Sequence, residues 1–165
     1  MKTLNNITKM ILLSAVFALA SCNKDDDNNN AVTPTPVAGD YFMTAKVNGS
    51  NYSNSAYFAP SATINSNVLQ IQSSTDSGSS IQIQVQNFDN VGTYNVGGNL
   101  SNGYVNYMTT FPFKSYTSVR GTGTVEVTEV TETFIKGTFT AVAPENEESP
   151  SSEVTITEGS FKVKR

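Results

Sequence analysis

Few side chains in this chain of 165 residues could carry out catalysis. There is no histidine, which excludes a Ser-His-Asp triad and histidine-mediated proton transfer. The only cysteine is Cys22, so neither imidazoles nor a set of thiolates can hold a transition metal. No glycine-rich stretch has the lysine and the following helix that a phosphate-binding loop needs. We therefore predict a protein that is not an enzyme and has no metal and no cofactor.

Paired carboxylates are the remaining catalytic option, since two acids about 5 to 10 Å apart can hydrolyse a glycosidic bond. Glu126 alternates with valines that should point inward, so we expect it to face solvent. Other acids fall in turns or in a loop rich in proline, serine and glutamate: Asp76, Asp89, Glu145, Glu147 and Glu148. We expect that loop to be solvated, and a carboxylate-dependent hydrolase is the least favoured interpretation.

Cys22 follows the features of an exported, lipid-modified protein. Lys2 and Lys9 precede a short apolar run, Met10–Ala20, which is typical of a signal peptide and too short to span a bilayer. At the end of this run, Leu19-Ala20-Ser21-Cys22 resembles the lipobox of bacterial lipoproteins. That resemblance implies a signal peptide over residues 1–21, cleavage before Cys22, and a covalent lipid on Cys22 that anchors the protein to a membrane.

Residues 22–38 are predicted to be a disordered tether, because acids, asparagines and prolines offer almost no apolar surface to bury. The segment Asn23-Lys24-Asp25-Asp26 resembles the export signal of Bacteroidota lipoproteins. This resemblance implies a lipid anchor in the outer membrane with the protein facing the cell exterior. A plain acidic linker, on a protein at the periplasmic face, is the alternative.

The charge of the chain argues against nucleic acid as a partner. Lys2 and Lys9 leave with the signal peptide, so 10 basic side chains become 8 against 14 acidic ones, a net charge of −6. Three tether residues alternate as calcium ligands do: Asp25, Asp27 and Asn29. Asn30 and Pro36 stand where a calcium loop needs glycine and glutamate, so we predict no calcium site.

Binding is chemically more open than catalysis. Aromatic residues cluster along a stretch that we expect to be long and irregular because Pro112 interrupts it; they are Tyr104, Tyr107, Phe111, Phe113 and Tyr116. Such rings could stack on sugars, or they could cap the end of the core. A glutamine row could likewise contact a polymer or simply be the solvent face of a hairpin; it comprises Gln70, Gln72, Gln82, Gln84 and Gln86.

The elements that must position these residues are strands. Ile81-Gln82-Ile83-Gln84-Val85-Gln86 alternates strictly, Val68–Gln72 repeats the pattern, and the serine-rich segment between them is typical of a hairpin connection. Asn48-Gly49 predicts a second hairpin, and Gly159 a bulge or bend. About nine or ten short strands are expected, which indicates one all-β domain over residues 39–165, an antiparallel β-sandwich or barrel.

The order of several short motifs adds a family resemblance. The motifs are Met43–Gly49 with Tyr52, Gly92-Thr93-Tyr94, Gly123–Thr128, Ile135–Thr140 and Val154–Phe161. Together they resemble a domain of unknown function found in small Bacteroidota surface lipoproteins. The resemblance implies a fold and a location, and it supplies no site residues because the family has no assigned activity.

These observations favour a membrane-anchored lipoprotein with a non-catalytic binding or structural β domain whose ligand is unknown. The alternative is a glycan-binding accessory module of a polysaccharide-uptake system. A protein or a glycan could be the partner.

Overall fold

A computed structural model describes residues 40–165, which form eleven strands and two short 3-10 turns, Leu100–Asn102 and Ser118–Arg120. The strands are β1 (Phe42–Val47), β2 (Ser50–Ser53), β3 (Ser61–Asn65), β4 (Val68–Ser74), β5 (Ser80–Val85), β6 (Gly92–Gly97), β7 (Gly103–Thr110), β8 (Phe113–Thr117), β9 (Thr122–Val130), β10 (Phe134–Pro144) and β11 (Glu153–Lys164). The predicted all-β class is confirmed, with eleven strands instead of nine or ten. Within the described residues no helix is long and apolar enough to cross a membrane.

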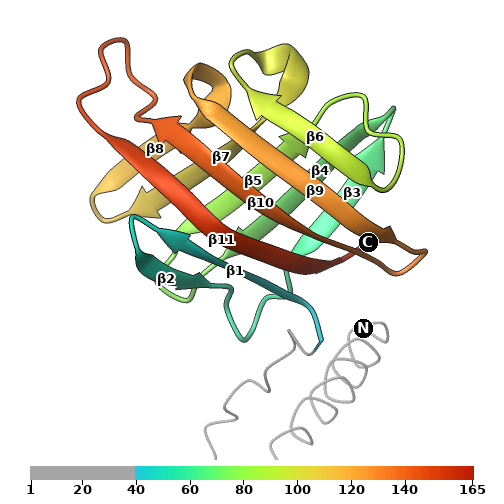
Figure 1. Ribbon diagram of the computed structural model, residues 1–165. Coiled ribbons are helices and arrows are strands. Elements are labelled where there is room, and N and C mark those ends of the chain that lie inside the picture. The colour runs from blue at the N-terminus through green and yellow to red at the C-terminus, as the bar shows by residue number, and fades with distance from the viewer. Residues whose placement is uncertain (1–39) are drawn as a thin grey trace, which may run out of the picture. The chain divides into compact units, whose positions relative to one another are not determined.

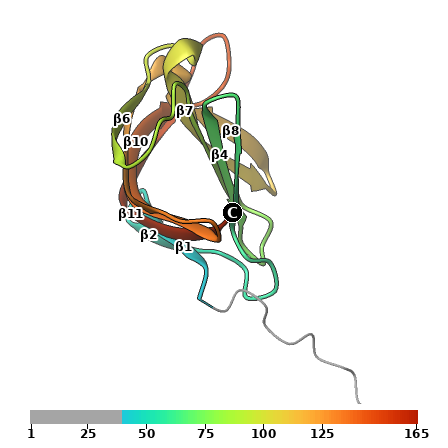
Figure 2. The same cartoon turned by 90° about the vertical axis from the view of Figure 1, so that its right-hand side faces the viewer.

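The strands make one sheet that folds over into two layers, seen edge-on in Figure 2. The first layer runs β6-β9-β10-β11-β1-β2 and the second runs β3-β4-β5-β7-β8 (Figure 1). All pairings within a layer are antiparallel. A parallel contact between Lys164 of β11 and Ser61 of β3 joins the layers along one side. A bridge between Tyr116 of β8 and Glu145 joins them along the other.

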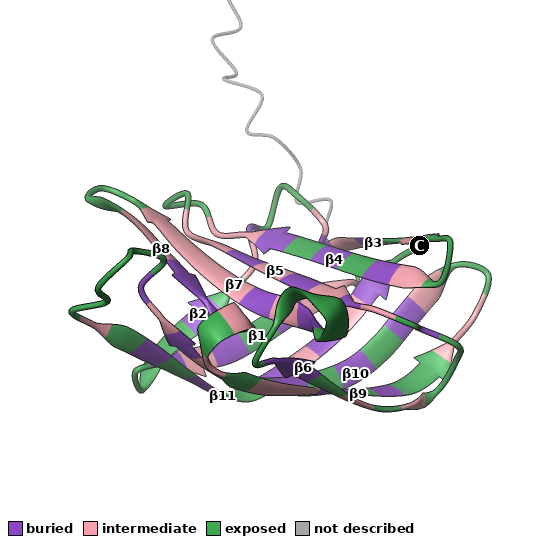
Figure 3. Ribbon diagram, turned by 90° about the horizontal axis from the view of Figure 1, so that it is seen from above, coloured by how far each residue is buried: buried purple, intermediate pink, exposed green. Residues whose placement is uncertain are grey.

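Strict alternation along the strands builds the core between these layers. In β5 the inward residues Ile81, Ile83 and Val85 are at most 1% exposed, while the glutamines between them are half-exposed. Figure 3 shows the same alternation of buried and exposed positions along the labelled strands. From the first layer Phe139 and Phe161 pack into the core with ring centroids 6.2 Å apart. Burying such side chains contributes about 1.5–3 kcal/mol each, so this pattern selects which face of every strand points inward.

The predicted turns are present. Asn48 and Gly49 have φ angles of 50° and 80°, the pair of positive values that a two-residue hairpin turn requires, and they connect β1 to β2. The serine-rich segment connects β4 to β5 in a regular antiparallel hairpin. Next to Gly159 the pairing of β11 shifts register against both β1 and β10, which confirms the predicted bulge.

The expectation of a long irregular stretch around Pro112 is wrong. β7 and β8 form a hairpin there, and the cis Phe111–Pro112 peptide lies at its tip, where no ladder hydrogen bond is needed from proline. Alternation resumes immediately afterwards in β8, with Tyr116 buried beneath the second layer. The proline therefore ends one strand and allows the chain to return in the next.

Candidate functional site

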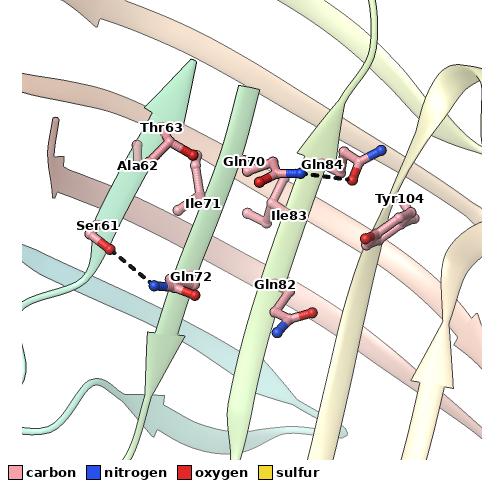
Figure 4. A pocket seen from close by; sticks show the side chains of 10 residues that line it. All are labelled: Ser61, Ala62, Thr63, Gln70, Ile71, Gln72, Gln82, Ile83, Gln84 and Tyr104. Carbon is pink, nitrogen blue, oxygen red and sulfur yellow. Dashed lines mark hydrogen bonds between the residues drawn. The ribbon is translucent and has the colours of Figure 1, made fainter. Parts of the chain in front are cut away.

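The outer side of the second layer carries neutral polar side chains and one tyrosine. We call this surface the amide face; its residues are Gln70, Gln72, Gln82, Gln84, Tyr104 and Asn106. Strand pairing sets them in two rows, because Gln84 lies between Gln70 and Tyr104. In the next row Gln82 lies between Gln72 and Asn106. Figure 4 shows most of these side chains, with the Tyr104 ring at the edge of the rows.

The amide face contains a shallow depression of about 270 Å³, lined by the four glutamines and Tyr104 together with residues of β3. Two amide contacts within it are long: Gln70 Nε2 donates to Gln84 Oε1 at 3.4 Å, and Gln72 Nε2 donates to Ser61 Oγ at 3.4 Å. Each carboxamide offers two donor hydrogens and an acceptor oxygen. Most of this hydrogen-bonding capacity therefore faces solvent and could serve a ligand.

No charge is present on this face. The strands β3, β4, β5, β7 and β8 contain one charged residue, Lys114, which sits opposite Thr109 on the inner side with Tyr116. A ligand of the amide face would therefore meet hydrogen-bond donors, acceptors and a ring, but neither a carboxylate nor an ammonium group. Such a surface suits an uncharged, hydroxyl- or amide-bearing molecule, and it offers no acid and base for hydrolysis.

Asn106 belongs to this site although the sequence analysis did not single it out. Its Oδ1 atom is enclosed and has no hydrogen-bond partner among the described residues. A buried amide oxygen without a partner is costly, so Asn106 does not stabilise the fold through this atom. The signal was available in the sequence, because Asn106 alternates with Val105 in phase with Tyr104.

The structure does not bring the predicted aromatic residues together on one platform. Tyr104 lies half-buried on the amide face, whereas Tyr107 and Tyr116 lie on the opposite, inner side of β7 and β8. The rings of these two are stacked with centroids 6.2 Å apart. Phe111 is 97% exposed at the hairpin tip and Phe113 is 71% exposed beside it. The five residues thus occupy three separate places.

These rings were expected either to stack on sugars or to cap the core. Tyr116, which is 8% exposed, and its partner Tyr107, which packs against the core, fit the second interpretation. Tyr104 keeps the sugar-stacking interpretation open at the amide face. The glutamine row is on the outer side of the β4–β5 hairpin, as both of its interpretations require. Gln86 follows β5 and lies beyond the depression.

Glu145 departs from the expectation that its loop is solvated. It is 5% exposed and receives hydrogen bonds from Lys114 Nζ at 2.9 Å and from the Ser152 hydroxyl. The hydrogen bond from Ser152, followed by that from Lys114, holds the pKa of the Glu145 carboxyl below its ordinary value of 4.5. The same pair raises the pKa of Lys114. These contacts tie β8 to the segment after β10, so they act between the layers and not at the amide face.

The predicted lipidation at Cys22, with its signal peptide and tether, lies outside the described residues. Among comparisons with known proteins, a family model for a domain of unknown function, DUF6252, matches residues 39–163. No curated protein and no solved structure matches the chain. The family match confirms the expectation of a domain of unknown function, and it brings no assigned activity.

Proposed function

We propose that this chain, which belongs to the DUF6252 family, is a lipid-anchored, non-catalytic binding protein whose ligand lies on the amide face. The lipid would be attached at Cys22, and the acidic tether would hold the domain at the outer face of the outer membrane of a Bacteroidota-type cell. Leu19-Ala20-Ser21-Cys22 after an apolar run supports the anchor, and Asn23-Lys24-Asp25-Asp26 supports the outward location.

One observation carries the binding proposal: a whole five-strand face has no charge, whereas the outer side of the first layer carries eight charged side chains. Solvent-facing strands of a soluble protein commonly carry lysine and glutamate, which keep the surface hydrated at little cost. Here those positions hold carboxamides, hydroxyls and Tyr104, with the apolar residues Val68, Met108 and Phe113 at or near the ends of their strands. Neutral amides give directional hydrogen bonds to a neutral partner without the desolvation cost of a charge.

A glycan-binding accessory module of a polysaccharide-uptake system is the second candidate. It is favoured by the Tyr104 ring at the end of the Gln70–Gln84 row, since an aromatic face beside amide donors and acceptors matches the apolar face and hydroxyls of a sugar. A neutral polysaccharide would satisfy this surface better than an acidic one, because no cation lines the depression.

The anchor is tested by growing cells with labelled palmitate. The label should enter the wild-type chain and be absent from Cys22→Ser. A native protein whose mass shows an unmodified sulfur at position 22 would overturn the lipoprotein proposal.

The binding proposal is tested by affinity electrophoresis of the full chain, carrying Cys22→Ser, through gels containing neutral polysaccharides of different linkage. Retardation should be lost in Gln70→Ala/Gln84→Ala and kept in Thr138→Ala/Thr140→Ala, whose residues lie on the outer side of the first layer. Equal retardation of both double variants would exclude the amide face. Retardation by none of the gels would remove the glycan candidate and leave a protein ligand.

A further inference from the structure

A second cavity lies at the end of the domain where the turns β1–β2, β4–β5 and β7–β8 meet, and we call it the end cleft. It encloses about 430 Å³ and lies between the layers, with Val47, Tyr52 and Val154 from the first layer and Tyr107 and Tyr116 from the second. Such a volume falls within the about 300–1,000 Å³ of small-ligand pockets. The cleft is remote from the amide face because Tyr107 points to the opposite side of β7 from Tyr104.

The walls of the end cleft combine rings with small neutral polar groups. Tyr107 and Tyr116 stack with an interplanar angle of 27° and form a continuous aromatic wall. The rim carries hydroxyls and amides, and no residue that lines the cleft is charged; the polar lining residues are Asn48, Ser50, Asn51, Thr75, Ser77, Ser79 and Thr109. The Tyr52 hydroxyl donates to Ser73 Oγ at 3.0 Å, so that ring is fixed, and burial raises the pKa of its phenol.

Some polar side chains of the rim already form hydrogen bonds to the backbone, and others form none among the described residues. Thr75 Oγ1 accepts from the Ser79 amide at 3.1 Å, and Asn48 Oδ1 accepts from the Thr155 amide at 2.8 Å. Among the described residues no hydrogen bond is formed by the hydroxyl of Tyr107 or of Ser79. Both residues line the same cleft, Tyr107 from β7 and Ser79 from the β4–β5 turn. A ligand seated between them could exchange hydrogen bonds with both.

We propose that the end cleft binds one neutral, pyranose-sized sugar unit, stacked on Tyr107 and hydrogen-bonded by the rim. The absence of charge in the lining disfavours phosphates, carboxylates and amines, whose buried charge would have no partner. The hydroxyl-rich rim disfavours a purely apolar molecule, which would leave those groups unpaired. A sugar ring has one apolar face for the tyrosine and hydroxyls around its edge for the rim. This inference does not depend on the ligand of the amide face.

The test titrates the full chain, carrying Cys22→Ser, with glucose, galactose, mannose and N-acetylglucosamine, and follows backbone amide shifts by NMR. At least one sugar should move the amides of Asn51, Ser77 and Ser79 in a saturable way. Tyr107→Leu, which keeps apolar bulk but removes the aromatic face, should weaken that binding about two- to tenfold. The matched control is Tyr57→Leu, the same substitution at a tyrosine that is 37% exposed and lines neither the end cleft nor the amide-face depression, which should leave the monosaccharide affinity unchanged.

Because Tyr107 packs against the core, the fold of Tyr107→Leu is checked by its thermal unfolding. Ser79→Ala removes one free rim hydroxyl at a half-exposed site and should weaken binding about two- to tenfold without altering the fold. The proposal is overturned if no sugar shifts the cleft amides, if the shifts map to the amide face instead, or if a folded Tyr107→Leu and Ser79→Ala both bind as tightly as the parent. If no gel retards the protein while a sugar titrates the cleft, the amide face is removed as a glycan site and the end-cleft proposal stands.

Discussion

The outer faces of the two layers have the same strand geometry and opposite chemistry. On the second layer every outward position of five strands is uncharged. On the outer side of the first layer threonines alternate with charged residues, and we call this surface the charged face. Its charged residues are Lys46, Glu126, Glu129, Lys136, Glu153, Glu158, Lys162 and Lys164. Both faces cover the same core, so neither fold nor burial explains the difference.

This contrast separates what folding demands from what it leaves free. Alternation requires apolar residues at inward positions and only polarity at outward ones. The charged face meets that requirement with ordinary solubilising residues, and threonine also favours the strand conformation. The amide face meets it with residues that are poorer at keeping a surface hydrated and better at directional, neutral contacts. A ligand on the amide face, as proposed above, would account for this difference.

The largest effect should come from the core that the two faces share. Phe161 is fully buried, so Phe161→Ala should destabilise the domain by about 3–5 kcal/mol through lost burial and the cavity left behind. Gln82→Ala, on the amide face, should stay within about 0.5 kcal/mol. Urea unfolding of both variants measures the two values. A cost for Gln82→Ala that approaches the cost for Phe161→Ala would mean that the amide face is structural.

The next prediction compares the two faces by adding one carboxylate to each of them in separate variants. Gln84→Glu places a carboxylate in the middle of the amide face and should weaken polysaccharide retardation at least about tenfold, or 1.4 kcal/mol, because that charge must be desolvated by a neutral ligand. Thr138→Glu puts the same group on the charged face and should have no effect on retardation. If both variants bind alike, the neutrality of the amide face has no role in recognition.

The sequence predicted the strands wherever polar and apolar residues alternate strictly. Strands are present at Ile81 to Val85 and at Val125 to Val127 for that reason. The β7–β8 hairpin was missed because Pro112 was taken to break a strand rather than to occupy a turn. β3 was not predicted either, because its short sequence Ser61–Asn65 has only Ala62 and Ile64 to mark its inward side.

The glutamine row of the amide face is visible in the sequence, but which residue of the next strand lies beside each glutamine is not. Register across strands, which brings Tyr104 next to Gln84 and Asn106 next to Gln82, is a long-range property. The end cleft is harder to predict from the sequence, since its lining joins residues as far apart in the chain as Val47 and Val154. Gly137 shows the same limit: a Cβ there would lie 2.7 Å from the Phe161 ring, a contact that only the folded sheet creates.

A smaller effect is expected from the ion pair between Glu145 and Lys114, the one charged residue in the strands of the second layer. Glu145→Gln should lower the midpoint of thermal unfolding at neutral pH, because it removes the partner of Lys114 that ties the two layers together. The pKa of Glu145 is lowered in the folded state, so its contribution is present above pH 4.5 and is lost as the pH falls through the lowered pKa.

Thermal unfolding of the parent and of Glu145→Gln across the acid range checks this sign. The difference between the two midpoints should be constant near neutral pH and should shrink as the pH falls below 4.5. A gap that widens toward acid would contradict the assignment. Polysaccharide retardation should be the same for both proteins, since the pair is on the inner side of β8 and away from the amide face.

The smallest effect is expected on the charged face itself. Lys46 Nζ and Glu158 Oε1 are 3.8 Å apart, and their side chains are 41% and 70% exposed. Water and salt screen such a pair, so Glu158→Gln should change the free energy of unfolding by less than about 0.5 kcal/mol. Glutamine can keep the positive φ of 52° at this bulge about as well as glutamate, so the backbone adds no further cost. Urea unfolding at low and high salt measures the change, and a loss above 1 kcal/mol would show that charges on this face hold the bulge of β11 in place. The charges on the charged face would then be needed for the fold. In that case the difference between the two faces could no longer be attributed to a ligand of the amide face alone.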